Sequence, residues 1–351
     1  MDLRKLTTAF EAAAKDDPAT MLMIARKLHN GGQYDDAAEL CRRALHLAPD
    51  DGWLKAAVKD LVTAHIPKWH FKIFGDALRN SAYDTALRRA VAPGARVLEI
   101  GTGSGLLAMM AARAGAREVI TCEMDRQVAE TARKIISRNG YTDRIKVLVK
   151  HSDKLDLAED LGGRADVIVS EIVSSNLLDE GVLPSHERVM RDFAHAGTIV
   201  IPARGVVRVA LAQDLRDPSL VLNDISGFDV SAFLELAKPK RSFVAGDPNV
   251  ILRGEPEDLF SFDFASPAYH APGRSRVVCR SSGGPVNGVA QWIKLTLDDV
   301  TSYENRPAAG VTSNWKLRFY RFDSPVETNP GDEIQVCGAH DRRNVLVWRQ
   351  E

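Results

Sequence analysis

Between residues 96 and 201 the sequence alternates short apolar runs with segments long enough to form a helix. The runs RVLEIG, EVITCEM, IKVLVKH and ADVIVSEI are separated by stretches such as LLAMMAARAG and QVAETARKIISRNG. Nearly continuous apolar runs are typical of strands that are buried on both faces of a parallel sheet. Parallel strands also need helix-length crossovers, which are right-handed. This pattern predicts a doubly wound α/β domain.

The residues before this region are rich in alanine and have a helical period. Gly32 and Tyr34 fall in a predicted turn, and Ala37, Cys41 and Ala44 lie on one face of the following helix. This layout is similar to one tetratricopeptide repeat, in which small residues let two antiparallel helices approach closely. Because such repeats usually need three or more units to stand alone, we expect a helical cap on the next domain rather than an independent binding module.

After Pro202 the helical period fades and short alternating runs take over, among them RGVVRVALAQD, GVAQWIKLTL, WKLRFYRF and NVLVWRQ. Glycine, proline, aspartate and asparagine separate these runs, which is typical of an antiparallel β-barrel or sandwich. The sequence therefore predicts a helical leader over residues 1–66, an α/β domain over residues 67–202 and a β-barrel domain over residues 203–351.

Composition excludes several classes of protein. Lysine plus arginine (46) nearly balances aspartate plus glutamate (47), so no bulk positive field favours direct nucleic-acid binding. No run approaches the ~20 apolar residues of a membrane span, and the first residues lack an apolar signal core. The four cysteines are far apart and the histidines lack ligand spacing, so we expect free thiols, no metal and a cytoplasmic protein.

A glycine loop follows the first predicted strand, with Gly101, Gly103 and Gly105 in the sequence EIGTGSG. Glycines let the backbone approach a ligand, and a helix N-terminus favours polar or negative groups. Glu123 ends the next strand, where an acid accepts hydrogen bonds from ribose hydroxyls. A nicotinamide dinucleotide motif would need glycine at position 106, which is Leu106, and the EIGTGSG form is similar to the S-adenosylmethionine loop of class I methyltransferases.

Two carboxylates flank the loop after the fourth strand, in SEIVSSNLLDEG. Glu171 follows the strand and Glu180 comes nine residues later. They converge only if the loop folds back, and their mutual repulsion then calls for a cation between them. An arginine guanidinium fits because it is permanently charged and presents a fork of donors to two carboxylates.

With this loop the chain resembles the protein arginine methyltransferases, whose double-glutamate loop clamps the substrate guanidinium. The segment PKWHF through Arg79-Asn80, the GFDVS segment and Ser313-Asn314-Trp315 are similar to motifs of the same family. The helical leader resembles the branch with N-terminal tetratricopeptide repeats that protein arginine methyltransferase 9 typifies. That branch has two methyltransferase modules in one chain, so the single module here implies a homodimer.

The resemblance implies a role for further residues. Arg79 would bind the carboxylate of the cofactor, His70 would lie over the cofactor, and Asp76 would support the active site. Asn314 takes the place of the family's histidine, and an amide cannot act as a base. To the cofactor site we also assign Ser185 and Asp153, the latter as the group that receives the adenine amino group; an ordinary solvated aspartate remains an alternative for Asp153.

The resulting hypothesis is methyl transfer from S-adenosylmethionine to an arginine in a protein substrate, held by Glu171 and Glu180. The carboxylates would draw positive charge onto the bound nitrogens and aim the remaining nitrogen at the sulfonium methyl. One alternative is methylation of a lysine or an N-terminal amine, as in enzymes that modify ribosomal proteins; neutral amines need deprotonation rather than a double clamp. The other alternative is a cofactor-binding pseudoenzyme that serves as a scaffold.

Overall fold

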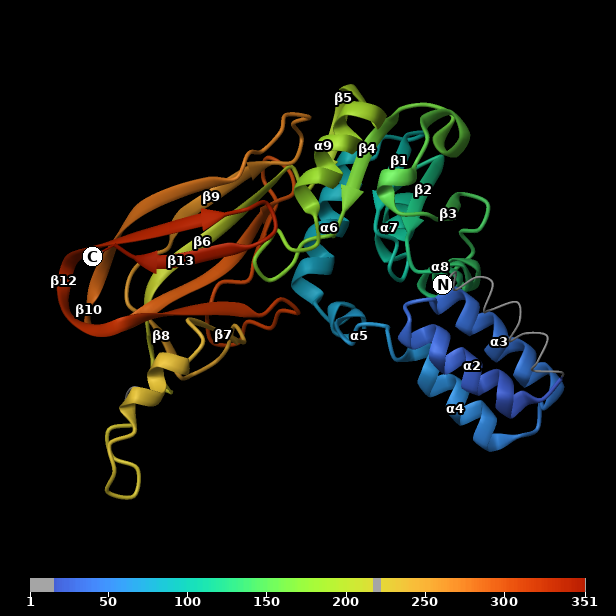
Figure 1. Ribbon diagram of the computed structural model, residues 1–351. Coiled ribbons are helices and arrows are strands. Elements are labelled where there is room, and N and C mark those ends of the chain that lie inside the picture. Colours follow the sequence, from blue (N-terminus) through green and yellow to red (C-terminus); the bar gives the residue numbers. More distant parts are fainter. Residues whose placement is uncertain (1–15, 217–221, 351) are drawn as a thin grey trace. The chain divides into compact units, whose positions relative to one another are not determined.

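The computed structural model describes residues 16–216 and 222–350, and the chain divides into two compact units after Lys72 (Figure 1). The first unit is helical, and the second contains an α/β part and a β part. The predicted division at residues 66 and 202 stays a prediction. The helices of the first unit are α2 (Pro18–Asn30), α3 (Tyr34–Leu47), α4 (Gly52–Thr63) and the first residues of α5 (Trp69–Ile73).

The helical unit has its own apolar core. Asp17 caps α2 by accepting the backbone N–H of Thr20 at 3.0 Å, and Asp51 caps α4 in the same way, so each helix begins at a residue favoured for this position. Ala37, Cys41 and Ala44 are at most 1 % exposed, which confirms the predicted buried face of α3. Small side chains on this face allow close packing of α2 and α3.

The α/β part is built on a five-stranded parallel sheet with the strand order β3-β2-β1-β4-β5. Its order reverses between β1 and β4, which is where open α/β sheets bind ligands. Its strands are β1 (Arg96–Ile100), β2 (Glu118–Glu123), β3 (Ile145–Val149), β4 (Ala165–Ser170) and β5 (Ala194–Ile201), and its helices are α6 (Ala77–Ala90), α7 (Leu106–Ala114), α8 (Arg126–Arg138) and α9 (Val182–Phe193). Two short helical turns, η1 (Ser152–Lys154) and η2 (Leu157–Leu161), follow β3.

Both faces of this sheet are buried. Val97 of β1 belongs to the core cluster formed with α6, α7 and α8, whereas its neighbour Leu98 packs in a second cluster with Val189 and Phe193 of α9. Successive residues of a strand point to opposite faces, so the strand can be apolar throughout. The structure confirms the predicted doubly wound sheet.

The β part is antiparallel and contains an eight-stranded sheet. Two strands of 24 residues, β10 and β12, pair along most of their length, and register shifts interrupt β10 near Ser282 and Gly288. This confirms the predicted antiparallel β domain. Its strands are β6 (Arg204–Asp214), β7 (Lys240–Phe243), β8 (Val250–Leu252), β9 (Glu257–Asp263), β10 (Gly273–Thr296), β11 (Ser302–Glu304), β12 (Leu317–His340) and β13 (Val345–Arg349).

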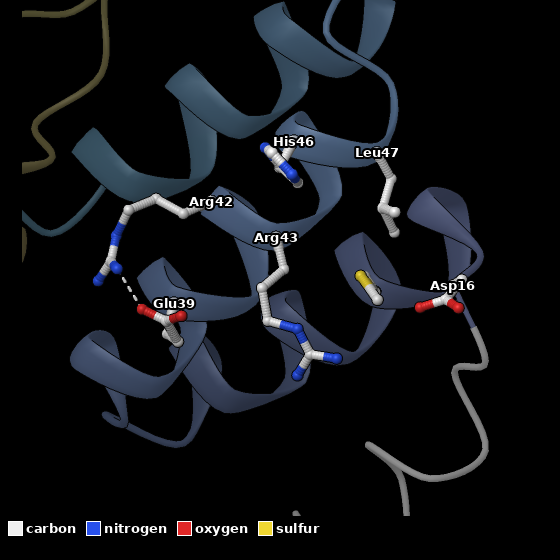
Figure 2. A pocket seen from close by; sticks show the side chains of 7 residues that line it. Asp16, Glu39, Arg42, Arg43, His46 and Leu47 are labelled. Carbon is white, nitrogen blue, oxygen red and sulfur yellow. Dashed lines mark hydrogen bonds and ion pairs between the residues drawn. The ribbon is translucent and has the colours of Figure 1, made fainter.

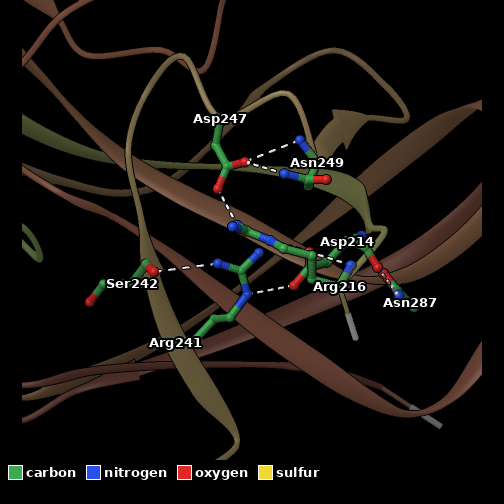
Figure 3. Close-up of polar contacts among 7 residues, drawn as sticks. All are labelled: Asp214, Arg216, Arg241, Ser242, Asp247, Asn249 and Asn287. Atoms are coloured by element: carbon green, nitrogen blue, oxygen red, sulfur yellow. Dashed lines mark hydrogen bonds and ion pairs between the residues drawn. The ribbon is translucent and has the colours of Figure 1, made fainter. Parts of the chain in front are cut away.

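A polar cluster fastens both ends of the segment between β6 and β7 (Figure 3). Asp214, which is 1 % exposed, accepts from Arg241 of β7 and from the backbone N–H of Arg216. Asn287 of β10 exchanges two hydrogen bonds with the backbone of Asp214, at 2.8 and 2.9 Å. The buried carboxylate is therefore paired, as burial of a charge requires. The cluster fixes the base of the segment at the sheet.

All four cysteines are buried free thiols. Within residues 16–216 and 222–350, no helix has the length and apolar character needed to cross a membrane.

Candidate active site

The parallel sheet brings three predicted site residues to one edge. In the register of the sheet, Ile100 lies opposite both Cys122 and Ser170. Gly101, Glu123 and Glu171 each follow one of these three residues, so they lie together at the carboxyl ends of β1, β2 and β4. This edge contains the switch point at which doubly wound sheets bind ligands.

The glycine loop between β1 and α7 needs its glycines for conformation and for space. Gly101, Gly103 and Gly105 have φ values of +85°, +50° and +79°, a region that L-residues avoid. A Cβ on Gly101 would lie 2.9 Å from Cγ2 of Ile172, whereas one on Gly103 would meet no atom within 4 Å. The loop therefore presents open backbone at Gly103 and packs tightly against the residue after Glu171.

Glu123 is bound to this loop. Its Oε2 accepts the backbone N–H of Gly103 at 3.1 Å, and its Oε1 accepts that of Asp125 at 3.0 Å. Desolvation raises the pKa of Glu123, and these two hydrogen bonds act in the opposite direction. The carboxylate is thus held next to the glycine loop, where we predicted a ribose-binding acid.

Glu171 pairs with Arg79, although the two residues are 92 positions apart in the sequence. Nη2 of Arg79 lies 2.6 Å from Oε2 of Glu171, with side chains that are 5 % and 9 % exposed. Two atoms of the pair are buried without a hydrogen-bond partner: Oε1 of Glu171 and Nε of Arg79. Unpaired buried donors and acceptors are costly, so this pair offers one acceptor and one donor to a ligand.

Asp76 joins the start of α6 to the β part. Its Oδ1 caps α6 by accepting the backbone N–H of Arg79 at 3.0 Å. Its Oδ2 accepts the Tyr303 hydroxyl at 2.8 Å and the backbone N–H of Asn314 at 3.3 Å. Ser313 in turn lies 2.7 Å from the Tyr303 hydroxyl. Asp76 therefore positions the start of α6 at Arg79, and its predicted supporting role in the active site stays a prediction.

The structure thus brings Asp76 and Asn314 together through the backbone of Asn314. The side-chain oxygen of Asn314 is buried and has no partner, so it remains open to a ligand. Tyr303 was missed by the sequence analysis. No motif marks it, because its role depends on a contact across 227 residues.

Glu180 lies at the other end of the loop that begins at Glu171. Its side chain is exposed, yet desolvation, followed by repulsion from Glu171 and Asp179, raises its pKa to about 8. Desolvation likewise raises the pKa of Glu171 to about 7, with Arg79 opposing the shift. Because Glu180 reaches solvent, screening moderates its repulsion by Glu171 and Asp179. Both carboxyls favour a nearby cation.

The remaining predicted cofactor residues stay predictions. Asp153 is exposed and pairs with Nδ1 of His151 at 2.9 Å. Ser185 is half-buried in the first turn of α9, and its backbone N–H bonds to Gly181. His70 belongs to the first unit, whereas the site residues described above belong to the second.

A separate pocket of about 310 Å³ lies in the helical unit (Figure 2). It contains an ion pair between Arg42 and Glu39, and none of its residues is a predicted site residue. Across the described part of the chain, no group of three or more histidine, cysteine, aspartate or glutamate side chains is placed to hold a metal ion. The residues lining the pocket are Asp16, Met21, Glu39, Arg42, Arg43, His46 and Leu47.

Comparison with known proteins first gives the class. The model of the family "Ribosomal protein L11 methyltransferase (PrmA)" matches residues 84–196, which lie in the α/β part. The fold is similar to that of a chain of the Trypanosoma brucei PRMT1 enzyme–prozyme heterotetrameric complex with AdoHcy, with a TM-score of 0.69 and 19 % identity over 81 % of this chain and 98 % of that one. The fold is therefore that of a methyltransferase core followed by a β domain.

The family follows from closer relatives. The chain is 37 % identical to an arginine N(omega)-methyltransferase of Streptomyces achromogenes, over 85 % of this chain and 83 % of the relative. It is 28 % identical to mouse protein arginine N-methyltransferase 9 over 93 % of this chain, but it spans only 43 % of that relative's length. The chain belongs to the arginine N-methyltransferase family, as the double-glutamate loop predicted.

Proposed function

We propose that this protein transfers a methyl group from S-adenosylmethionine to the guanidinium of an arginine in a protein substrate. The observation that carries the proposal is the 2.6 Å contact between Glu171 and the guanidinium of Arg79. It supports the idea that the carboxylate on this loop suits a guanidinium, and Oε1 of Glu171 has a free position for another. A lone lysine amine would not need Glu180 as a second carboxylate.

The residues at the sheet edge suit the cofactor. Gly103 offers open backbone, Glu123 offers a carboxylate for the ribose, and the unpaired Nε of Arg79 offers a donor for a carboxylate. When bound, the cofactor supplies an electrophilic methyl group. His70, Asp153 and Ser185 complete the set that we propose for cofactor binding.

The chain's own part in the reaction is to bind and orient the acceptor. Glu171 and Glu180 hold the N–H groups on two of the guanidinium nitrogens, which leaves the third nitrogen directed at the methyl group. Charge-assisted bidentate contacts of this kind fix the orientation of the guanidinium as well as its charge. Holding the two reactants in the correct geometry lowers the activation barrier, because the entropy of bringing them together is lost on binding. Asp76 keeps Arg79 in place by capping α6, and Asn314 offers its unpaired oxygen to the acceptor.

We further propose a homodimer. Residues 222–239 extend from the β part (Figure 1) and expose Phe228, Phe233 and Leu236 at 70 %, 69 % and 74 %. Several large apolar side chains on one exposed segment are typical of an interaction site, and a second copy of the chain is the partner that a single-module member of this family needs. We also propose a cytoplasmic location for the protein. A tetratricopeptide-like role for the helical unit is a separate proposal, which the packing of α2 and α3 supports.

The test is a methylation assay with isotopically labelled cofactor, followed by mass spectrometry of the acceptor. The acceptors are an arginine peptide, the same peptide with lysine in place of arginine, and free arginine, because the Streptomyces relative is named for arginine without mention of a protein. The proposal predicts label on the guanidinium of the arginine peptide. Label on lysine, or on free arginine alone, would contradict it.

A further inference from the structure

The loop from Glu171 to Glu180 must reverse direction for its two carboxylates to reach one guanidinium. Residues 171–174 have no regular structure, and turns and bends follow them. Desolvation and mutual repulsion both oppose two ionised carboxylates at one site. Something in the loop or next to it must therefore hold the carboxylates together.

The reversal occurs at Asn176. Its side chain is 5 % exposed, and its Oδ1 accepts the backbone N–H groups of Leu178 and Asp179 at 2.9 and 3.1 Å. An asparagine that accepts backbone N–H groups two and three residues ahead stabilises a turn. Leu177, which lies between Asn176 and Leu178, has a φ of +76°. This conformation costs a non-glycine residue free energy. Asn176 thus offsets the strain of the turn that brings Glu180 back.

The other end of the same amide fixes the turn to the β part. Nδ2 of Asn176 donates to the carbonyl oxygen of Arg343, between β12 and β13, at 3.2 Å. Two neighbouring carbonyl groups of the loop are also bound by β-part side chains: that of Val173 by Nε1 of Trp315 at 2.8 Å, and that of Ser175 by Nε2 of Gln291 at 3.4 Å. The loop is therefore held from the side of the β domain at three nearby positions.

We propose that Asn176 is a positioning residue for the acceptor site, which sets the separation of the Glu171 and Glu180 carboxyl groups by folding the loop and anchoring it to the β domain. The inference rests on the proposed function. Only an amide can do both tasks at this position, because a carboxylate accepts without donating and a hydroxyl cannot span both partners. The amide of Asn176 is engaged by groups of the chain itself, so it acts on the acceptor only through the loop.

The test compares Asn176→Ala and Asn176→Asp with the wild type in the full-length protein. Ser281→Ala is the matched control, because Ser281 is 4 % exposed and also binds a backbone group, the N–H of Gly283, but outside this loop. For each protein we would measure the thermal midpoint, the cofactor affinity, kcat/KM for the arginine peptide between pH 6 and about 9, and the titration of the Glu180 carboxyl by NMR. The Glu180→Gln variant assigns the NMR signal.

Asn176→Ala should lower kcat/KM by about a hundredfold through misplacement of the clamp, with cofactor affinity unchanged. Its Glu180 carboxyl should titrate at lower pH than in the wild type, because the released side chain moves into solvent and away from Glu171. Asn176→Asp keeps the acceptor oxygen that stabilises the turn and loses the donor that binds the carbonyl of Arg343. Its kcat/KM should therefore lie between those of the wild type and Asn176→Ala, and its Glu180 carboxyl should not titrate at lower pH than in the wild type. Ser281→Ala should lower the thermal midpoint alone.

Wild-type kcat/KM and an unchanged Glu180 titration in folded Asn176→Ala would overturn the proposal. A loss of kcat/KM with an unchanged titration would also overturn it, since a purely structural role predicts that result. If the wild type does not methylate arginine, the proposed function fails, but the NMR titration still decides whether Asn176 sets the environment of Glu180.

Discussion

At the scale of single residues, the two glutamates of the acceptor loop have different duties. Glu171 binds Arg79 through one oxygen and keeps the other free, so its replacement would disturb both the acceptor and the residue proposed to bind the cofactor. Within the described residues, Glu180 forms no hydrogen bond or ion pair with the protein. Glu180 is therefore the cleaner position at which to test the clamp.

We predict that Glu180→Gln lowers kcat/KM for an arginine peptide by roughly a hundredfold, because a charge-assisted contact contributes roughly 1.5–3 kcal/mol and each 1.36 kcal/mol is tenfold in rate. The cofactor affinity, measured by calorimetry, should change less than about threefold, because sites that share no partner are nearly independent of each other. A comparable loss of cofactor affinity would place Glu180 in the cofactor site instead.

The pH dependence follows from the same two carboxyls. Both must be ionised to hold a guanidinium, and their pKa values are raised to about 7 for Glu171 and about 8 for Glu180. Arginine stays protonated across this range. We predict that kcat/KM rises with pH through 7 and 8 and then levels off, whereas the Glu180→Gln variant loses the later part of the rise. A flat profile from pH 6 to about 9 would contradict this assignment.

At the scale of elements, the sequence predicts the strands and the glycine loop because their signals are local. Glu171 and Glu123 could be placed at the sheet edge from strand ends alone. The Arg79–Glu171 pair, the Tyr303–Asp76 hydrogen bond and the Asn176 anchor could not be predicted from residue patterns, because each joins segments that are 92 to 227 residues apart. Asn176 carries one local signal, since asparagine favours turns.

The glycine loop gives a prediction at this scale. Gly101→Ala places a Cβ 2.9 Å from Ile172, next to Glu171, at a φ of +85°. Gly94→Ala is the matched control, with a φ of +86° and open space around the added atom. Both variants should lose about 1–2 kcal/mol of unfolding free energy through the left-handed backbone, but only Gly101→Ala should also weaken cofactor binding. If Gly101→Ala and Gly94→Ala bind the cofactor with equal affinity in calorimetry, the contact with Ile172 has no effect on cofactor binding.

At the scale of the whole molecule, the segment formed by residues 222–239 exposes large apolar side chains, those of Phe228, Phe233 and Leu236. Its base is fixed by the buried Asp214 cluster, yet its apolar side chains are exposed. A firmly attached segment with an uncovered apolar face suits a protein partner. The proposed partner is a second copy of the chain.

We predict that Phe233→Asp in this segment converts the proposed dimer to a monomer, because a charge would have to be buried in an apolar contact. Val300→Asp is the control, since Val300 is 77 % exposed near β11, outside the segment. Analytical ultracentrifugation at micromolar concentration measures the change. An unaltered dimer in Phe233→Asp would exclude this segment as the contact, and a monomeric wild type would exclude the homodimer.

The loop between Glu171 and Glu180 is proposed to clamp the guanidinium of a protein arginine for methyl transfer. The most direct measurement is mass spectrometry of an arginine peptide incubated with labelled S-adenosylmethionine and either wild type or Glu180→Gln, at equal cofactor occupancy. The predicted result is methyl label on the guanidinium with the wild type and little label with the variant. Equal labelling by both proteins, or label on another residue type, would contradict the claim.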